Sequence, residues 1–125
     1  MQATNGRLVL SPTDLNDYVE CAHLTTLSRE VALGTRQRPH VPEDHADLLR
    51  RKGDEHEAAY LAALRTAGRK VANVVGADPW DFATSARATE QAMRAGAEII
   101  YQATFVVGQW RGRADLLARI GQETD

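Results

Sequence analysis

Two side chains in this sequence, His56 and Asp115, are of types that bind divalent metal ions. His56 lies in RRKGDEHEAAYL, where a helical repeat of apolar residues predicts that the imidazole faces the core. Asp115 lies in WRGRADLL, on a predicted strand. If the two side chains converge, they could share one ion, which would activate a water molecule for hydrolysis. Taken singly, His56 is also compatible with a hydrogen-bonded core histidine, and Asp115 with a solvated strand residue.

A β-hairpin is expected to carry Asp115. The stretch IIYQATFVVGQWRGRADLLARI predicts two strands joined by a type II′ turn at residues 108–109. Counting outward from that turn pairs Val107 with Trp110 and Gln102 with Asp115. In this register Gln102 can donate an amide hydrogen to the Asp115 carboxylate and orient it, as residues behind metal ligands commonly do.

Strand alternation gives this hairpin two different faces. The apolar face consists of Tyr101, Ala103, Phe105, Val107, Trp110, Ala114 and Leu116. The polar face consists of Gln102, Thr104, Arg111, Arg113, Asp115 and Arg119, interrupted by Ile100, Val106 and Leu117. We expect the polar face to lie under the helix that carries His56, because the shared metal site requires it.

Two groups of basic residues flank the proposed metal position. Arg50, Arg51 and Lys52 precede His56 on its helix, and Arg111 and Arg113 share the face of Asp115. Both groups are candidates for contacts with phosphate, although the net charge of −2 gives no general basic field. If all five contacted DNA, the logarithm of affinity would fall with the logarithm of salt concentration with a slope of roughly −4 to −5.

Composition indicates an ordinary soluble protein. The chain has 125 residues, 43% of them hydrophobic and 26% charged, which corresponds to one domain. No apolar run is long enough for a membrane span, and no signal peptide is visible. The single cysteine, Cys21, excludes an internal disulfide and is expected to be a buried thiol. We therefore predict a cytoplasmic protein without a membrane partner.

The predicted elements alternate between helix and strand. Ser11 and Pro12 begin a helix over 11–34, and a second helix runs over 43–67, with a mid-helix Gly53 that suggests a close neighbour. A short strand at 70–75 follows.

A third helix opens at the DPWD segment and ends at Gly96, and the hairpin closes the chain. It is expected to present Phe82, Ala86, Glu90 and Met93 on one side. Because the order ends just after a strand, we expect residues 1–125 to be the N-terminal part of a larger α/β domain.

Three motifs together resemble a known family. A helix with Gly-x-x-His, in RRKGDEHEAAYL, precedes a strand with Gly-x-x-Asp, in WRGRADLL. The opening LSPTDLNDYVECAHL is similar to the start of the same branch of proteins, where a capped helix carries Tyr-x-x-Cys. The chain resembles the RecB-like branch of the PD-(D/E)xK nucleases over residues 8–120, and most closely a bacterial family of RecB-like nucleases.

The resemblance implies a fold and a chemistry. The fold would be restriction-endonuclease-like, with helices packed on a small, mostly antiparallel sheet. The activity would be metal-dependent hydrolysis of DNA, with His56 and Asp115 binding Mg²⁺ or Mn²⁺. In a subset of the family the cysteine of Tyr-x-x-Cys binds an iron–sulfur cluster, which would make Cys21 its first ligand.

The chain also departs from the family pattern. It lacks the (D/E)-x-Lys strand and the Gln-x-x-x-Tyr helix that should follow the hairpin. We therefore expect the C-terminal half of the nuclease domain to be missing and the chain as given to be inactive. Two alternatives stay open at this point: a non-catalytic nucleic-acid-binding or assembly module on a nuclease scaffold, and a structural domain without a ligand.

Overall fold

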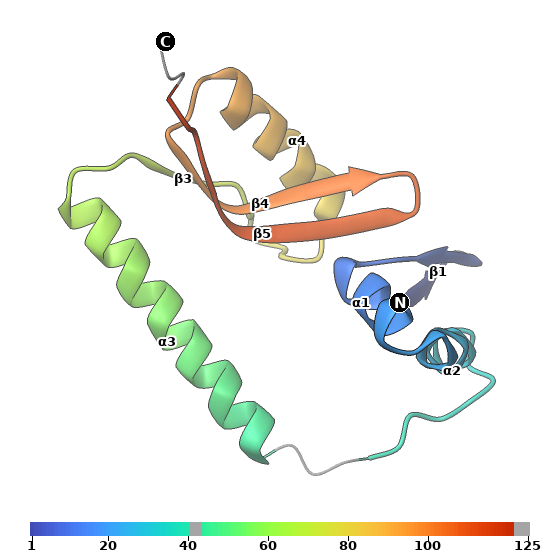
Figure 1. Cartoon of the computed structure of the whole chain (residues 1–125). Coiled ribbons are helices and arrows are strands. Elements are labelled where there is room, and N and C mark those ends of the chain that lie inside the picture. Colours follow the sequence, from blue (N-terminus) through green and yellow to red (C-terminus); the bar gives the residue numbers. More distant parts are fainter. Residues whose placement is uncertain (41–43, 122–125) are drawn as a thin grey trace.

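The computed structural model describes residues 1–40 and 44–121, and over these residues the fold is mixed α/β with four helices and two small sheets (Figure 1). In chain order the elements are β1 (Gln2–Thr4), β2 (Arg7–Val9), α1 (Pro12–Glu20), α2 (Ala22–Ala32), α3 (Asp44–Thr66), β3 (Val71–Asn73), α4 (Phe82–Arg94), β4 (Ile99–Val107) and β5 (Trp110–Ala118). The predicted α/β class is confirmed, and the restriction-endonuclease-like fold stays a prediction. No helix among the described residues has the length and apolar character needed to cross a membrane.

The β4–β5 hairpin is the centre of the larger sheet. Its register pairs Val107 with Trp110 and Ala103 with Ala114, as the turn predicted. Gly108 has φ +58 and Gln109 does not have a positive φ, which is the pattern of a type II′ turn. The hairpin is antiparallel, whereas the short β3 runs parallel to β4 on its other side.

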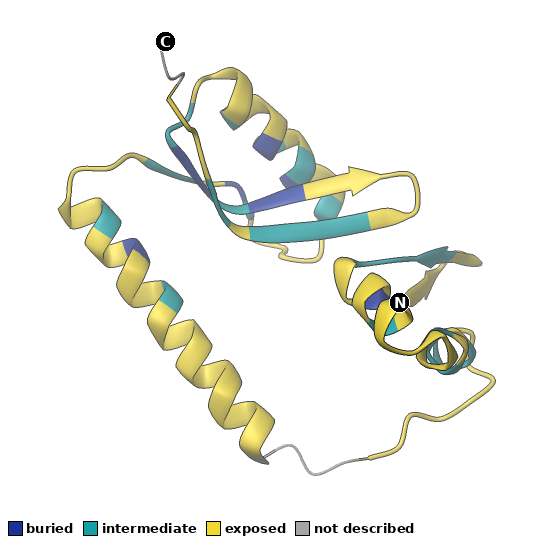
Figure 2. Ribbon diagram, in the orientation of Figure 1, coloured by how far each residue is buried: buried dark blue, intermediate teal, exposed yellow. Residues whose placement is uncertain are grey.

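Helix α4 covers one face of the hairpin, and the core lies between them (Figures 1 and 2). Its apolar centre is Val74, Ile100 and Ala103, which are at most 7% exposed. A polar contact lies beside it, because the Thr89 hydroxyl accepts the backbone N–H of Thr104 at 2.8 Å. This hydroxyl satisfies a buried donor that would otherwise lose its bond to water.

Helix α4 begins later than the DPWD segment predicted. Asp81 is the N-cap and accepts the backbone N–H of Thr84 at 2.9 Å, so the helix starts at Phe82. The buried side of α4 carries Ser85 and Thr89, whereas the predicted Glu90 and Met93 are exposed. These small polar residues allow α4 to pack closely on β4. The spacing of apolar residues in the sequence does not indicate that the buried side of α4 is polar.

The N-terminal region docks on the outer edge of β5. The Leu10 N–H donates to the Gln109 carbonyl at 2.8 Å, and the Arg111 N–H donates to the Leu10 carbonyl at 2.9 Å. The predicted Ser11 cap is confirmed: its backbone N–H and its hydroxyl each donate to the Asp14 carboxylate at 2.7 Å. These contacts fix the start of α1 beside the turn of the hairpin.

The C-terminal end of helix α3 lies near the sheet, and its N-terminal end lies far from it (Figure 1). Its bounds agree with the predicted 43–67 to within one residue, although Glu43 lies outside the described residues. The end of α3 is tied to the sheet by Glu98, which pairs with Arg69 and accepts the Lys70 backbone N–H at 3.2 Å. Among the described residues, no neighbouring segment comes within 4 Å of the position that a side chain at Gly53 would take, so the predicted close approach is wrong.

Candidate functional site

The side of α3 that is shielded from solvent does not include His56. The shielded stripe is Glu57, Leu61 and Leu64, at spacings of four and three residues, and His56 is exposed. The prediction that the imidazole faces the core is therefore wrong by one helical position. The cause is the alanine-rich second half of α3, where small residues on several sides leave the apolar stripe poorly defined. The shared metal site of His56 and Asp115 stays a prediction.

Glu57 of α3 contacts the hairpin through a hydrogen bond. Its Oε1 accepts a hydrogen bond from Nε2 of Gln102 at 2.9 Å. The prediction that Gln102 orients Asp115 is a second error, because its amide is directed to α3. The backbone explains this: Gln102 has φ +57 inside a strand, and the ladder skips the Gln102–Asp115 pair while keeping the register on both sides.

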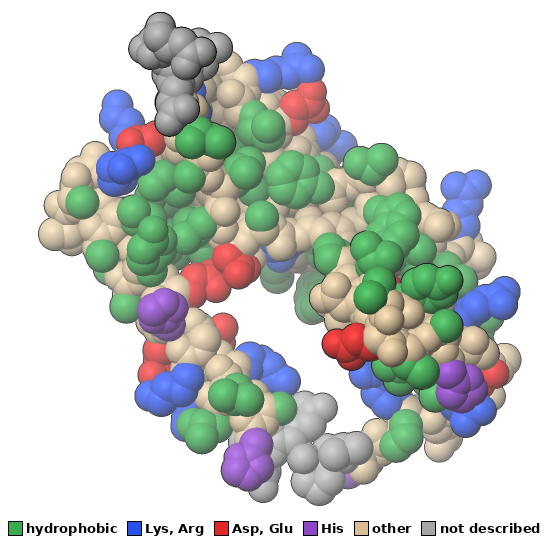
Figure 3. Space-filling view, viewed as in Figure 1, with side chains coloured by type: hydrophobic (Ala, Val, Ile, Leu, Met, Phe, Trp, Pro, Cys, Tyr) green, Lys and Arg blue, Asp and Glu red, His purple; other side chains and the backbone are tan. Residues whose placement is uncertain are grey.

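Tyr101 connects this contact to Asp115. Interaction with the Glu57 carboxylate, followed by partial burial, raises the pKa of the Tyr101 hydroxyl, and the charge of Asp115 adds to the effect. Glu57 and Asp115 thus both act on one phenol. Acidic side chains gather where α3 meets the sheet (Figure 3). Asp115 itself is exposed, and within residues 1–40 and 44–121 its carboxylate forms no hydrogen bond or ion pair.

These groups do not make a complete metal site. Among the described residues no group of three or more His, Cys, Asp or Glu side chains could hold an ion together. Mg²⁺ prefers octahedral coordination by oxygen, and Mn²⁺ also accepts nitrogen, so two carboxylates alone would bind either ion weakly. The described donors therefore do not complete a site for Mg²⁺ or Mn²⁺, so the cofactor stays a prediction and no catalytic step follows from them.

Positive charge also gathers at the hairpin arginine pair, Arg111 and Arg113. Both guanidinium groups lie against the Phe82 ring, with their central carbons 4.5 and 4.6 Å from its centroid. Neither forms an ion pair with a carboxylate in the part of the chain that the structure describes. The predicted polar face therefore meets α4 at this point, and the expectation that it lies under α3 is wrong for these residues.

Neutral groups hold the pair in place. Arg113 donates through Nη2 to the Pro79 carbonyl at 2.6 Å and through Nε to the Thr104 hydroxyl at 3.2 Å. Arg111 donates through Nη2 to the side-chain oxygen of Gln2. Each guanidinium carries five N–H donors, so both retain free donors for a ligand. Two cations fixed in this way, half-buried and near each other, favour the approach of an anion.

The α3 basic cluster, Arg50, Arg51 and Lys52, is arranged differently. All three residues are exposed. Within α3, Arg50 pairs with Asp47 at 2.6 Å and Lys52 pairs with Glu55 at 2.7 Å. Most of the positive charge that the sequence suggested is therefore balanced on the same helix.

Cys21 marks the break between α1 and α2. It has φ −159 and ψ 108, which interrupts the single helix predicted over 11–34. The thiol is exposed, so the prediction of a buried cysteine is wrong. Its role as an iron–sulfur ligand stays a prediction, because a cluster needs four thiolates and the sequence has one.

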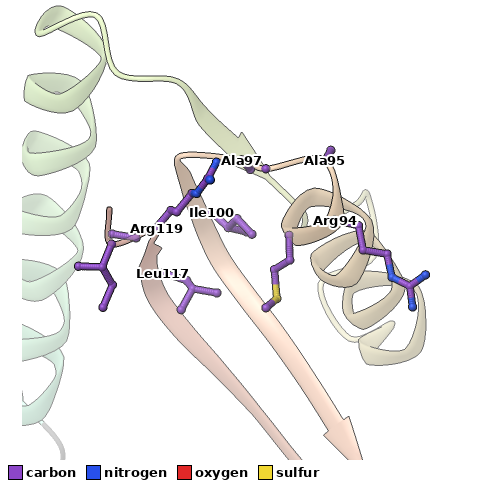
Figure 4. Close-up of a pocket in the computed structure, with 10 residues that line it drawn as sticks. Arg94, Ala95, Ala97, Ile100, Leu117 and Arg119 are labelled. Atoms are coloured by element: carbon purple, nitrogen blue, oxygen red, sulfur yellow. The ribbon is translucent and has the colours of Figure 1, made fainter. Parts of the chain in front are cut away.

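A cavity of about 680 Å³ lies away from all of these residues, between the end of α4 and the end of β5 (Figure 4). Ile100, Leu117 and Ala97 line it, with Arg119 along one side and Arg94 directed outward. None of the predicted site residues lies in its wall. It offers apolar surface and no group suited to hydrolysis.

Sequence-based prediction missed Glu57 and Phe82. Glu57 directly follows His56, so a one-residue shift of the helical face would have identified it. Phe82 could have been found from two signals in the sequence. It is an aromatic residue at the start of a predicted helix, and Arg111 and Arg113, two residues apart, lie on one face of a predicted strand. The connection between them depends on the packing of α4, which local patterns do not reveal.

Comparison of the chain with protein-family models, curated proteins and solved structures finds no match.

Proposed function

We propose that this chain binds nucleic acid through the hairpin arginine pair, as the phosphate-binding part of a RecB-like nuclease domain. The observation that carries the proposal is the placement of two guanidinium groups on one phenylalanine ring without a carboxylate partner among the described residues. Arginine suits this task because its planar fork of donors matches the oxygens of a phosphate. The partner would be DNA, as the resemblance to nucleases implies.

Repulsion between the two arginines favours a bound anion. Two cations near each other and partly shielded from water repel one another, and a bound phosphate would relieve that repulsion. Contacts with the backbone of a nucleic acid carry most of the affinity of nonspecific binding and weaken with salt. Binding through two local arginines does not require an excess of positive charge over the whole chain, which agrees with the net charge of −2.

Binding to fluorescein-labelled DNA, followed by anisotropy at low salt, tests the proposal. Arg111→Gln combined with Arg113→Gln should weaken binding at least about tenfold, because charge-assisted bonds to phosphate are lost. The matched control is Arg50→Gln with Arg51→Gln, which removes the same charge from α3 and should cost less than about threefold. Equal losses in both double variants would contradict the proposal, because net charge alone would then explain them.

Metal-dependent hydrolysis is the second candidate function, proposed for a more complete nuclease. The observation that favours it is that Glu57, which accepts a hydrogen bond from Gln102, and Asp115 lie close enough to Tyr101 to raise the pKa of its hydroxyl. Phosphodiester hydrolysis requires further metal ligands and a positioned cation. Because catalytic groups act as a unit, the absence of some of them removes most of the activity. We therefore expect no cleavage by this chain.

An assay with Mn²⁺ on single- and double-stranded DNA checks that expectation. Wild type, His56→Ala, Glu57→Gln and Asp115→Asn should all leave both substrates intact. Cleavage by wild type that one of these variants abolishes would show a functioning site in this chain. If the chain neither binds nor cleaves DNA, the reading as a structural domain without a ligand takes the place of both candidates.

A further inference from the structure

A second pocket adjoins the hairpin arginine pair and has an aromatic wall. It measures about 380 Å³ and lies between the start of α1 and the start of α4. Its lining includes Arg111, Arg113, Phe82, Trp80 and Pro12. We propose that this pocket receives single-stranded nucleic acid, with an unpaired base stacked on Trp80 and the adjoining phosphate on the arginines. The inference rests on the proposed function and names the form of its ligand.

Trp80 is the exposed aromatic of this pocket. Its side chain is 73% exposed, although indole is among the side chains that gain most from burial. Phe82 differs, because both guanidinium groups already cover its ring. A stacking base would therefore use the indole, whereas the phenyl ring serves to position the arginines.

The backbone around Trp80 is held in a defined turn. The Trp80 N–H donates to Oδ1 of Asp78 at 2.9 Å, and the Asp81 N–H donates to the Asp78 carbonyl at 3.2 Å. Pro79 accepts the hydrogen bond from Arg113 at 2.6 Å, so one arginine is tied to the residue next to the indole. The backbone that carries the stacking platform is thus bonded directly to the phosphate donor, which keeps the two in one region.

Single strands suit this arrangement better than duplexes. In a duplex the bases are stacked on each other and their flat faces are not available to a protein, whereas an unpaired base can leave its neighbours. Proteins that bind single strands combine aromatic platforms with cations along the backbone, and both are present here. The carboxylates of Asp78 and Asp81, in the turn that carries Trp80, oppose broad contact with a densely charged duplex.

Three labelled probes of equal length separate these contributions: oligothymidylate, an abasic strand with the same phosphates, and a duplex. Trp80→Ala should weaken binding of oligothymidylate by about 5- to 150-fold, the range for loss of one stacked base. The abasic strand and the duplex should bind Trp80→Ala as they bind wild type. Tyr60→Ala, which removes another half-exposed aromatic from α3, should leave all three affinities unchanged.

The outcomes distinguish this inference from the proposed function. An unchanged affinity of Trp80→Ala for oligothymidylate, or an equal loss for all three probes, overturns the stacking role. In either case the arginine proposal still stands if Arg111→Gln with Arg113→Gln weakens all three probes. If wild type binds none of the probes, both fail. Trp80→Phe keeps an aromatic ring in the same turn and should bind oligothymidylate with intermediate affinity, which excludes a general folding defect.

Discussion

The two basic groups of this protein contain nearly the same side chains and have opposite surroundings. On α3, the basic cluster is exposed and two of its three members pair with acids one helical turn away. On the hairpin, the arginine pair is half-buried, lies on an aromatic ring and is held by neutral acceptors. The α3 cluster carries three positive charges and the hairpin pair two, yet we propose the hairpin pair as the site for an external anion.

The physical reason is the competition between internal and external partners. An exposed ion pair contributes about 0–1 kcal/mol, but it occupies the donors that a phosphate would need. A guanidinium held by an aromatic face and carbonyl groups keeps its full charge and part of its donors. We therefore expect the partners of a basic residue, rather than the number of basic residues, to determine whether it binds a polyanion.

The largest effect is expected at Phe82, since both arginines depend on it. Phe82→Ala removes a half-buried ring and two contacts with cations, and should lower the free energy of unfolding by about 2 kcal/mol. DNA affinity should fall in parallel. Leu49→Ala on α3, where the side chain is 73% exposed, should change stability by less than about 0.5 kcal/mol. Urea denaturation measures the free energy of unfolding of both variants. Similar losses of stability in Phe82→Ala and Leu49→Ala would refute the special role of Phe82.

Salt dependence sharpens the comparison further. Each phosphate contact contributes about −0.9 to the slope of log affinity against log salt for duplex DNA. Arg111→Gln with Arg113→Gln should flatten that slope by about 2, whereas Arg50→Gln with Arg51→Gln should flatten it by less than about 1. A wild-type slope near −5 would mean that all five basic residues contact phosphate, as the sequence alone suggested.

A smaller effect is expected from Asp81, the N-cap of α4 next to the arginine pair. Hydrogen bonds from Thr84 lower the pKa of its carboxyl from the ordinary 3.8, so it is charged at neutral pH and opposes a bound phosphate. Asp81→Asn keeps a good cap and removes the charge, which should improve DNA affinity about threefold. Because the pKa is lowered, wild-type affinity should not rise as pH falls from 7 to about 5. A rise that Asp81→Asn lacks would contradict the assignment.

The smallest effect should come from α3 itself. Gly53→Ala replaces a glycine that has open space around it, and should raise the free energy of unfolding by about 0.5 kcal/mol through helix propensity. DNA affinity should stay the same if α3 takes no part in binding. Thermal unfolding measures the stability and anisotropy measures the DNA affinity. A loss of affinity in this variant would show that α3 takes part in binding.

Local signals predicted the elements well. The Gly108 turn sets the hairpin register by counting alone, and the Ser11 cap sets the start of α1, because both depend on a few adjacent residues. The break at Cys21 was missed, since the apolar spacing continues through it. Strand β3 was correctly expected, although it is only three residues long.

The candidate site was harder to predict because it depends on packing. His56 and Glu57 differ by one helical position, and the alanines that follow them give no preference between the two. At Gln102 the positive φ redirects a side chain that simple alternation assigned to Asp115. The α3 basic cluster was overrated for a related reason: a linear sequence shows its charges but not which acids neutralise them.

The central claim concerns two side chains, and nuclear magnetic resonance can observe both directly. Spectra of the arginine Nε–Hε groups, recorded while DNA is added, report which guanidinium groups gain a phosphate. We predict that the signals of Arg111 and Arg113 shift with a common affinity while those of Arg50 and Arg51 stay in place. Shifts of Arg50 and Arg51 with the hairpin signals unmoved would contradict the account.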